Sequence, residues 1–326
     1  MRKTICRGIN FFLETLGLTL QEKKVFSSLL WEREALAVLY QAFSQRIPKA
    51  CKYPAEGIVF SKDRALQLHA LLASYYEKVT APIPLHILYD TSSPAHQAAY
   101  EEVFSLFAGR QASFTKQKSN ESFADDLIKL LGAIEAEKVL FLVDDNLFIE
   151  EVDMRDFTKY DTDKFVPSLR MGLNLDRCYV LQQKQPLPAL WRPEAPEEKD
   201  KLCWHWHQGV LEWGYPLSVD GHLFSTQEMT AMAKLISFRA PNTFEDNLQK
   251  FYRLFSPRLG VSYRKSRIVN IPCNKVQKEN DNICGNVTPD FLLEKWQQGL
   301  QMNYRQLYGF QNNSVHQDIA FELIPR

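Results

Sequence analysis

An uninterrupted apolar run near the middle of the chain limits the fold more than any other feature. Residues 139–143 are all apolar, and Asp144, Asp145 and Asn146 follow directly. A continuous apolar run of this length predicts a strand buried on both faces, as in the interior of an α/β sheet. Its polar end puts two carboxylates at the carboxyl end of the strand, where open α/β sheets bind ligands. The alternative is that Asp144 and Asp145 only begin a turn or cap a short helix.

Strand–helix units precede this run. Residues 57–60 and 85–89 are β-prone, and each segment leads through a polar turn into apolar residues at helical spacing. Strands alternating with helices of about 10–15 residues predict a parallel sheet with right-handed crossovers. We therefore expect an α/β fold with a mixed, mostly parallel central sheet flanked by helices. The other predicted elements are strands at 112–114, 166–172, 178–181 and 267–272, and helices at 66–76, 95–107, 123–134, 226–238, 244–254 and 289–309.

Changes along the chain in the spacing of apolar residues and in the position of prolines predict three regions. Residues 1–54 form a helical extension that Pro48 and Pro54 close, residues 55–287 a central domain divided near residue 150, and residues 288–326 a C-terminal helical segment. In the extension, the apolar residues recur at helical spacing and indicate a helix with one buried face. We expect this face to pack on the protein; the alternative is a partner surface or a face that leans on a membrane. The apolar positions are Leu29, Leu30, Leu36, Leu39, Tyr40 and Phe43.

Composition excludes several classes of protein. The formal net charge is zero, which argues against a nucleic-acid binder that works through bulk positive charge. The six cysteines form no CxxC pair, so we expect free thiols in a reducing compartment. We find neither a signal peptide nor an apolar run of about 18 residues, and therefore expect a cytoplasmic protein without a transmembrane helix.

Charged residues also follow the first two predicted strands. Ser61, Lys62, Asp63 and Arg64 come after the first strand, and Asp90 ends the second. Because the carboxyl ends of parallel strands share one edge, we expect these side chains near Asp144 and Asp145. Asp63 is suited to accept a hydrogen bond from a base or ribose hydroxyl, and Arg64 to face a phosphate. The alternative is that Asp63 only complements a helix dipole.

The acidic pair is a candidate metal site. Carboxylate oxygens are hard ligands suited to Mg²⁺ or Mn²⁺, and a diphosphate would complete the coordination shell. Adjacent side chains of a strand point in opposite directions, so at most one of the two aspartates faces the metal directly. We expect Asp145 to take the metal, and Asp144 to take a ribose hydroxyl or a backbone amide.

Candidates for acceptor activation lie in the second half of the central domain. Asn242 or Thr243 is a candidate helix N-cap, and Glu245 and Asp246 follow in the first turn. A carboxylate at this helix start is suited to remove a proton from an attacking hydroxyl as a general base. The alternative is that these residues only cap and stabilise the helix.

A tract after residue 200 is rich in tryptophan and histidine. Its aromatic rings are suited to stack on sugars, although core packing explains each of them as well. Two histidines spaced by two residues would share one face of a strand and could form a metal pair. Single histidines are either ligands or structural. The aromatic candidates are Trp204, Trp206, Trp213 and Tyr215; the histidines are His205, His207, His222 and His316.

The order of these motifs resembles that of GT-A-fold glycosyltransferases, specifically bacterial family-2-like members. The resemblance covers residues 56–275 and rests on residues 59–72, 87–90, 139–145, 168–172 and 241–245. It implies a GT-A-like, Rossmann-like domain with a nucleotide-binding half at 55–150 and an acceptor-binding half at 151–287. The chain departs from the family's Asp-x-Asp motif, because it reads Val143-Asp144-Asp145-Asn146; the alignments Asp144-x-Asn146 and Val143-x-Asp145 both stay open.

The resemblance implies transfer of a sugar from a nucleotide-diphosphate sugar, UDP-linked in preference, to a hydroxyl of a glycan or lipid-linked acceptor. It implies Mn²⁺ or Mg²⁺ assistance and inversion. The N-terminal helices add peripheral contact with the inner face of the membrane as an alternative to a purely cytoplasmic location. The alternatives are a sugar nucleotidyltransferase and a non-catalytic nucleotide- or carbohydrate-binding module. The implied donor-binding residues are Ser61, Lys62, Asp63, Arg64, Asp90, Asp144 and Arg170; the metal ligands Asp145, Asp144 and His316; the catalytic acids Glu245 and Asp246; and the acceptor-binding residues Trp213, Tyr215 and His222.

Overall fold

The computed structural model describes residues 30–31, 33–39, 51–119, 121–190, 199–272 and 287–326. The chain divides into two compact units, Met1–Ile47 and Pro48–Arg326. No helix in the described part of the chain is both long enough and apolar enough to span a bilayer.

The described residues of the first unit are helical, as predicted. Ala35 and Leu39, four residues apart, are buried, whereas Leu30 and Leu36 are exposed. The prediction that Leu30 and Leu36 lie on the buried face with Leu39 is therefore wrong. Leu36 is rotated by about 100° from Ala35 around the helix axis, which takes it away from the face that Ala35 and Leu39 share. Leu29, Tyr40 and Phe43 lie outside the described residues.

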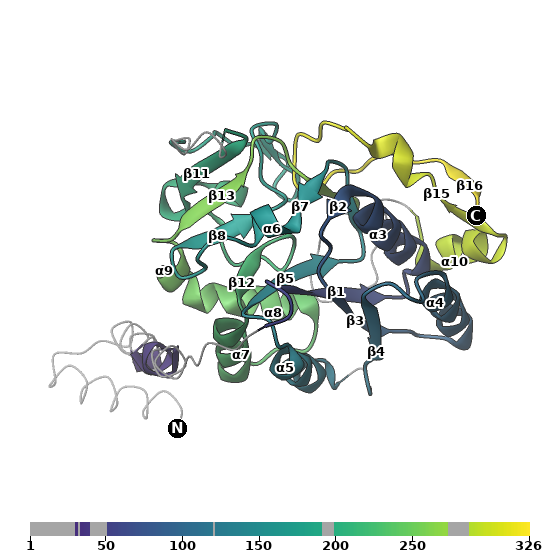
Figure 1. Cartoon of the computed structure of the whole chain (residues 1–326), viewed down its shortest axis with the longest axis horizontal. Helices are drawn as coiled ribbons and strands as arrows, with labels where there is room; N and C mark the ends of the chain where they lie inside the picture. Colours follow the sequence, from purple (N-terminus) through teal and green to yellow (C-terminus); the bar gives the residue numbers. More distant parts are fainter. Residues whose placement is uncertain (1–29, 32, 40–50, 120, 191–198, 273–286) are drawn as a thin grey trace, which may run out of the picture. The chain divides into compact units, whose positions relative to one another are not determined.

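A five-stranded sheet forms the centre of the second unit (Figure 1). Its spatial order is β12-β5-β1-β3-β4; the last four strands of this order are parallel, and β12 is antiparallel to β5. Strand β1 is therefore central, with β5 and β3 on its two sides. The strands are β1 (Glu56–Lys62), β3 (Leu85–Asp90), β4 (Ala112–Lys116), β5 (Lys138–Val143) and β12 (Leu223–Ser225).

Helices cover both faces of this sheet (Figure 1). On one face, α3 (Ala65–Lys78), α4 (Pro94–Leu106) and α10 (Pro289–Gln297) pack against one another. On the other face, α7 (Thr226–Leu235) contacts both α5 (Phe123–Ala133) and α8 (Pro241–Leu248). The predicted mixed, mostly parallel central sheet flanked by helices is confirmed.

The two covered faces explain the apolar run of β5. Its residues 139–142 are fully buried, and successive side chains point to opposite faces of the sheet. Leu140 joins the core cluster with α3 and α4, whereas the ring of Phe141 lies 5.8 Å from that of Phe60 and 6.1 Å from that of Phe244 on α8. An alternating pattern would leave one face polar, so only a continuous apolar run fits this position.

Smaller sheets and short helices build the second half of the unit. A three-stranded sheet has the order β11-β13-β8, and four two-stranded pairs are β14-β6, β2-β7, β9-β10 and β15-β16. These strands are β2 (Val79–Thr80), β6 (Asn146–Phe148), β7 (Val152–Asp153), β8 (Phe165–Ser168), β9 (Arg177–Cys178), β10 (Gln183–Lys184), β11 (Lys201–His205), β13 (Leu259–Tyr263), β14 (Ile268–Asn270), β15 (Leu300–Met302) and β16 (Leu323–Pro325). The short helices are α6 (Met154–Phe157), η2 (Trp206–Gln208), η3 (Leu211–Gly214), η4 (Gln249–Phe251), α9 (Tyr252–Phe255) and η5 (Tyr304–Leu307).

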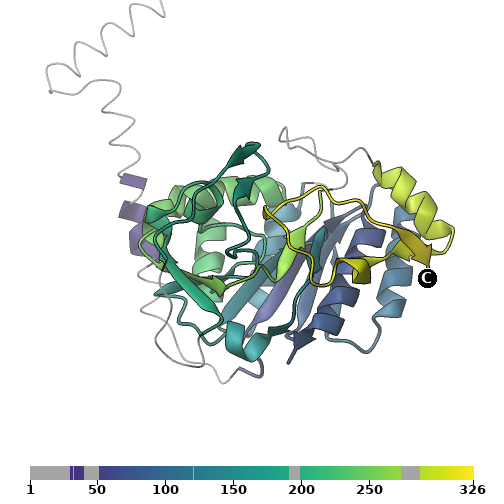
Figure 2. The same ribbon diagram turned by 90° about the horizontal axis from the view of Figure 1, so that it is seen from above.

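The C-terminal segment departs from the prediction. The helix expected at 289–309 ends at Gln297, because Gly299 adopts φ +76° and thereby terminates α10 before β15 begins. The chain then returns to the second half of the unit (Figure 2). There His316 forms a β-bridge with Asn270. Residues 315–317 therefore lie beside β14, whereas the last residues of the chain form β16, which pairs with β15.

Candidate functional site

The carboxyl ends of β1, β3 and β5 bring the predicted polar residues together. In the sheet register Ser61 pairs with Tyr89, Lys62 with Asp90, and Phe60 with Val143. The Lys62 Nζ lies 2.7 Å from the Asp90 carboxylate, and Asp144 follows β5 directly. One sheet edge therefore holds residues from three separate parts of the sequence.

Asp144 is the most deeply buried acid of this edge, at 3% exposure. Its Oδ2 accepts hydrogen bonds from the Ser61 hydroxyl at 2.8 Å and the Lys62 amide at 3.2 Å. The Ser61 hydroxyl also lies 2.5 Å from the Tyr100 hydroxyl. Burial raises the pKa of Asp144 to about 6, while the nearby Arg64 opposes this rise.

Arg64 joins the two aspartates. Its Nη1 lies 2.9 Å from Asp144 Oδ1 and 2.9 Å from Asp145 Oδ2, so one guanidinium nitrogen bridges both carboxylates. The other oxygen of Asp145, Oδ1, accepts from Asn270 Nδ2 at 2.8 Å. Asn270 comes from the end of β14, which ties the second half of the unit to this edge.

Asp63 connects β1 to the loop after β3. It has a left-handed φ of +53°, a conformation that aspartate tolerates better than most residues. Its carboxylate accepts the Ser92 amide at 2.7 Å, and His96 lies 3.9 Å away. Asp63 thus fixes the turn that positions Arg64.

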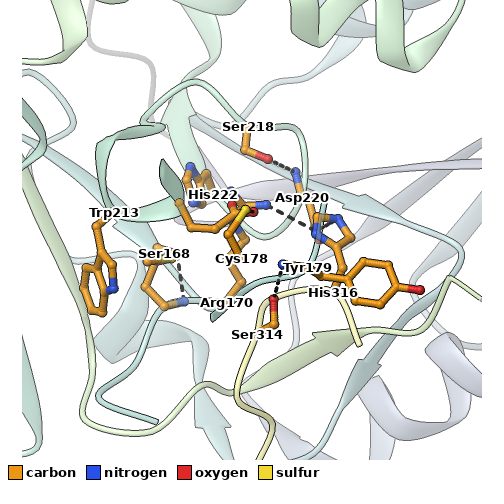
Figure 3. Close-up of polar contacts among 12 residues, drawn as sticks. Ser168, Arg170, Cys178, Tyr179, Trp213, Ser218, Asp220, His222, Ser314 and His316 are labelled. Carbon is orange, nitrogen blue, oxygen red and sulfur yellow. Dashed lines mark hydrogen bonds and ion pairs between the residues drawn. The ribbon is translucent and has the colours of Figure 1, made fainter. Parts of the chain in front are cut away.

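Asp220 is the centre of a second polar cluster (Figure 3). Its Oδ1 accepts from Asn146 Nδ2 at 2.6 Å, and its Oδ2 lies 3.5 Å from both Arg170 Nη1 and His316 Nε2. Asn146 follows Asp145 in the chain, and its own Oδ1 accepts the Val143 amide at 2.9 Å. The two clusters are therefore connected through residues 143–146.

Arg170 is buried within this second cluster, at 2% exposure. Its Nη2 donates to Glu212 at 2.8 Å, in addition to the contact of Nη1 with Asp220. The Cys178 thiol lies 3.7 Å from the other oxygen of Glu212, and burial raises the pKa of this thiol. Arg170, predicted to bind the donor, thus lies between two acids of the protein.

Glu245 and Asp246 are neighbouring residues of α8, but their side chains have different surroundings. Glu245 Oε2 accepts from the Val219 amide at 2.7 Å and from the Ser218 hydroxyl at 3.1 Å, so it holds the loop that carries Asp220. Burial raises the pKa of Glu245, against the opposing charge of Arg170. Asp246 is exposed.

The predicted acceptor-binding residues divide between surface and interior. Tyr215 is partly buried, and burial raises the pKa of its hydroxyl. Trp213 is fully buried, with its ring 4.9 Å from that of Trp204. His222 is also fully buried and contacts the Pro216 carbonyl at 3.0 Å, and burial lowers its pKa. Trp213 and His222 therefore belong to the interior of this structure, because the tryptophan-rich tract packs on itself.

The carboxylate oxygens of Asp144 and Asp145 are of a type that binds divalent cations. Asp144 and Asp145 already share one positively charged group, Arg64, and the buried Oδ1 of Asn270 has no hydrogen-bond partner among the described residues. His316, the third predicted ligand, contacts Asp220 instead. Within the described ranges, no group of three or more His, Cys, Asp or Glu side chains is arranged to hold a metal ion.

Sequence reasoning missed three residues of the site: Asn270, Asp220 and Tyr100. Asn270 lies inside the strand predicted at 267–272 and gave no signal, because the observed β14 ends at Asn270. Asp220 precedes Gly221 and therefore resembled an ordinary turn residue. Tyr100 lies inside a helix and gave no signal, because only the sheet register brings α4 beside Ser61.

A separate polar hollow of about 520 Å³ contains none of the predicted site residues. Arg264, Lys265 and Arg267 line it together with Glu150 and Asp200. Its cations are partly neutralised, because Lys265 lies 3.8 Å from Glu150 and Arg267 pairs with Asp200.

No protein-family model and no curated protein matches the chain. Among solved structures, the chain is similar to the apo structure of WbbM, which is described as a bifunctional glycosyltransferase. The TM-score is 0.35 and the sequence identity 13%, over 65% of this chain and 39% of that one. The chain thus spans well under half of the length of that protein.

Proposed function

We propose that this chain is a glycosyltransferase that moves a sugar from a nucleotide-diphosphate sugar to an acceptor hydroxyl. The observation that carries the proposal is the link between the two polar clusters. Asp144 and Asp145 lie at the ligand-binding edge of a parallel sheet, and Asn146 joins them to Asp220, beside Glu245. A donor held at the first cluster would place its reacting carbon toward the second.

In this proposal the first cluster binds the donor. Ser61, Asp63 and Arg64 face the nucleoside, and Lys62, with a side chain 38% exposed, is the accessible cation for a phosphate. A divalent cation bound at Asp145 would neutralise charge on the departing diphosphate. UDP-sugars are the preferred donors, by the family resemblance.

The second cluster activates the acceptor. Glu245 takes the proton of the acceptor hydroxyl, the oxygen bonds to the anomeric carbon, and the bond from that carbon to the diphosphate breaks, with inversion. Burial raises the pKa of Glu245, which brings this carboxyl closer to the pH at which a general base works best. Turnover should therefore fall as the pH falls through this raised pKa, because the protonated carboxyl cannot accept the proton.

The test is a panel of UDP- and GDP-sugars, assayed for transfer and slow hydrolysis with Mn²⁺ or Mg²⁺. We expect Asp145→Ala to lower turnover by about a hundredfold or more, because it removes a charged group from the donor site. Asp125→Ala, an exposed acid in the first turn of α5, is the matched control. Full activity of Asp145→Ala would remove this residue from the site.

A second comparison identifies the base. Glu245→Gln should lower turnover by about a hundredfold or more while nucleotide binding, measured by calorimetry, is retained. Asp246→Asn tests the neighbouring acid, and Glu294→Gln, on the exposed side of α10, is the control. If Asp246→Asn alone loses turnover, the base is Asp246. Nucleotide binding without any transfer would favour a binding module, and no nucleotide binding at all would overturn the proposal.

A further inference from the structure

The Arg64 guanidinium fills the position between the two aspartates of the donor site. Both contacts of 2.9 Å come from the same nitrogen, and the side chains of Arg64, Asp144 and Asp145 are only 11%, 4% and 11% exposed. Charges this well shielded from water interact strongly, and removing one partner leaves an uncompensated charge. The two carboxylates therefore need a positive charge beside them, and the Arg64 guanidinium provides it.

Hydrogen bonds from the protein go to one oxygen of each carboxylate, and Arg64 contacts the other. Asp144 Oδ2 is taken by Ser61 and Lys62, and Asp145 Oδ1 by Asn270. The remaining oxygens, Asp144 Oδ1 and Asp145 Oδ2, are the two that Arg64 contacts. A divalent cation at this pair would compete with Arg64 for these two oxygens.

Asn270 points independently to a cation site. It is 5% exposed, and its Nδ2 contacts Asp145, yet its Oδ1 is buried and meets no hydrogen-bond donor among the residues that the structure describes. A buried carbonyl oxygen without a partner is costly, and this one belongs to a side chain that contacts Asp145 and is of the hard-ligand type that divalent cations take.

We propose that Arg64 competes with a divalent cation for the Asp144–Asp145 pair. Two carboxylates and one guanidinium leave a net charge of one negative unit, so the pair attracts a second cation, but Arg64 must leave before that cation can bind. The chain alone then binds Mn²⁺ weakly, and removal of the guanidinium tightens binding. This deepens the proposed function, since the same pair would serve the donor, yet its test requires neither nucleotide nor turnover.

The experiment is a Mn²⁺ titration of the full chain, in which electron paramagnetic resonance counts the free ion. Arg64→Gln should bind Mn²⁺ at least about tenfold more tightly than the unchanged chain, because its carboxylates are no longer occupied. Asp145→Asn added to Arg64→Gln should abolish this gain and thereby assign the ion to the pair. Arg305→Gln, which removes a guanidinium from the exposed ion pair with Glu77, should bind like the unchanged chain.

Three outcomes would overturn the proposal. They are equal Mn²⁺ affinities of Arg64→Gln and the unchanged chain, no Mn²⁺ binding by a folded Arg64→Gln, and a gain that survives Asp145→Asn. If Arg64→Gln does not fold, Arg64→Lys replaces it, since an ammonium cannot reproduce the planar guanidinium contacts. Arg64→Lys should then show a smaller gain, and an unchanged affinity would overturn the proposal. Failure of every sugar nucleotide to react would remove the proposed function and leave the Mn²⁺ result standing.

Discussion

At the scale of single residues, Asp220 connects parts of the molecule that are far apart in sequence. Its carboxylate contacts Asn146, Arg170 and His316, which lie on different segments of the second unit. The backbone amide of Asp220 donates to the Ser218 hydroxyl, which in turn contacts Glu245. Through its side chain and its backbone amide, this residue connects Asn146, next to the acidic pair, with the predicted base.

Asp220→Asn should destabilise the protein by roughly 2 kcal/mol, because the buried Arg170 then loses one of the two carboxylates that it contacts directly. Urea denaturation of both proteins measures this difference. Asp163→Asn, an exposed aspartate in a turn, is the control and should change the free energy of unfolding by less than about 0.5 kcal/mol. Equal stability of Asp220→Asn and the unchanged chain would show that the cluster contributes nothing to the fold.

The sequence predicted the residues of the first cluster better than those of the second. Asp144, Ser61 and Arg64 lie at the carboxyl ends of strands that the alternation of strands and helices predicts to be parallel, so their shared edge was predictable. Asp220 and Asn270 come from the second half, where short strands in five separate small sheets carry weak periodicity. Their meeting depends on long-range pairing, which local patterns do not specify.

At the scale of elements, the small sheet β11-β13-β8 depends on a close approach of one tryptophan. Gly260 on β13 lies opposite Trp204 on β11. A Cβ atom at Gly260 would lie 2.2 Å from the indole of Trp204, which is fully buried and cannot move aside. Gly132 in α5 is different, because a Cβ there would meet nothing within 4 Å.

These two glycines form a matched pair. Gly260→Ala should lower the free energy of unfolding by about 1–3 kcal/mol, because it overpacks the sheet. Gly132→Ala should raise it by about 0.5–1 kcal/mol, since alanine favours the helix. Thermal or urea denaturation measures both changes. A Gly260→Ala protein as stable as the unchanged chain would contradict the tight contact with Trp204.

Element boundaries show where sequence patterns fail. The apolar spacing of residues 289–309 continues beyond Gln297, but Gly299 takes a left-handed conformation, and the following residues pair with β16 instead. The helix expected at 244–254 is likewise divided among α8, η4 and α9. Periodicity identified the apolar faces, whereas the ends of these elements depend on tertiary contacts.

At the scale of the whole molecule, the C-terminal segment closes over the first helix of the sheet. His69 on α3 lies among aromatic rings, 5.4 Å from Trp296 and 6.4 Å from Tyr304. Burial, together with the charge of Arg326, lowers the pKa of His69 to about 4. The folded protein therefore holds this imidazole neutral at pH values at which the unfolded chain would protonate it.

This difference predicts acid sensitivity with a definite sign. The unfolded chain binds a proton at His69 below about pH 6.5 and the folded protein only below about pH 4, so stability is lost as the pH falls between these values. On acidification, the free energy of unfolding of His69→Leu should fall by up to about 3 kcal/mol less than that of the unchanged chain. Urea denaturation at pH 7 and pH 4.5 compares the two proteins. If both lose stability equally on acidification, another group is responsible.

Because the C-terminal segment returns to β14, the second cluster combines residues that are synthesised early with one that is synthesised late. A nascent chain that has emerged as far as β14 already contains Asp144, Asp220 and Asn270, but not His316, which meets Asp220 and bridges to Asn270. The acids of the cluster are therefore synthesised before the histidine that contacts Asp220. A chain that ends before residue 316 would lack this contact.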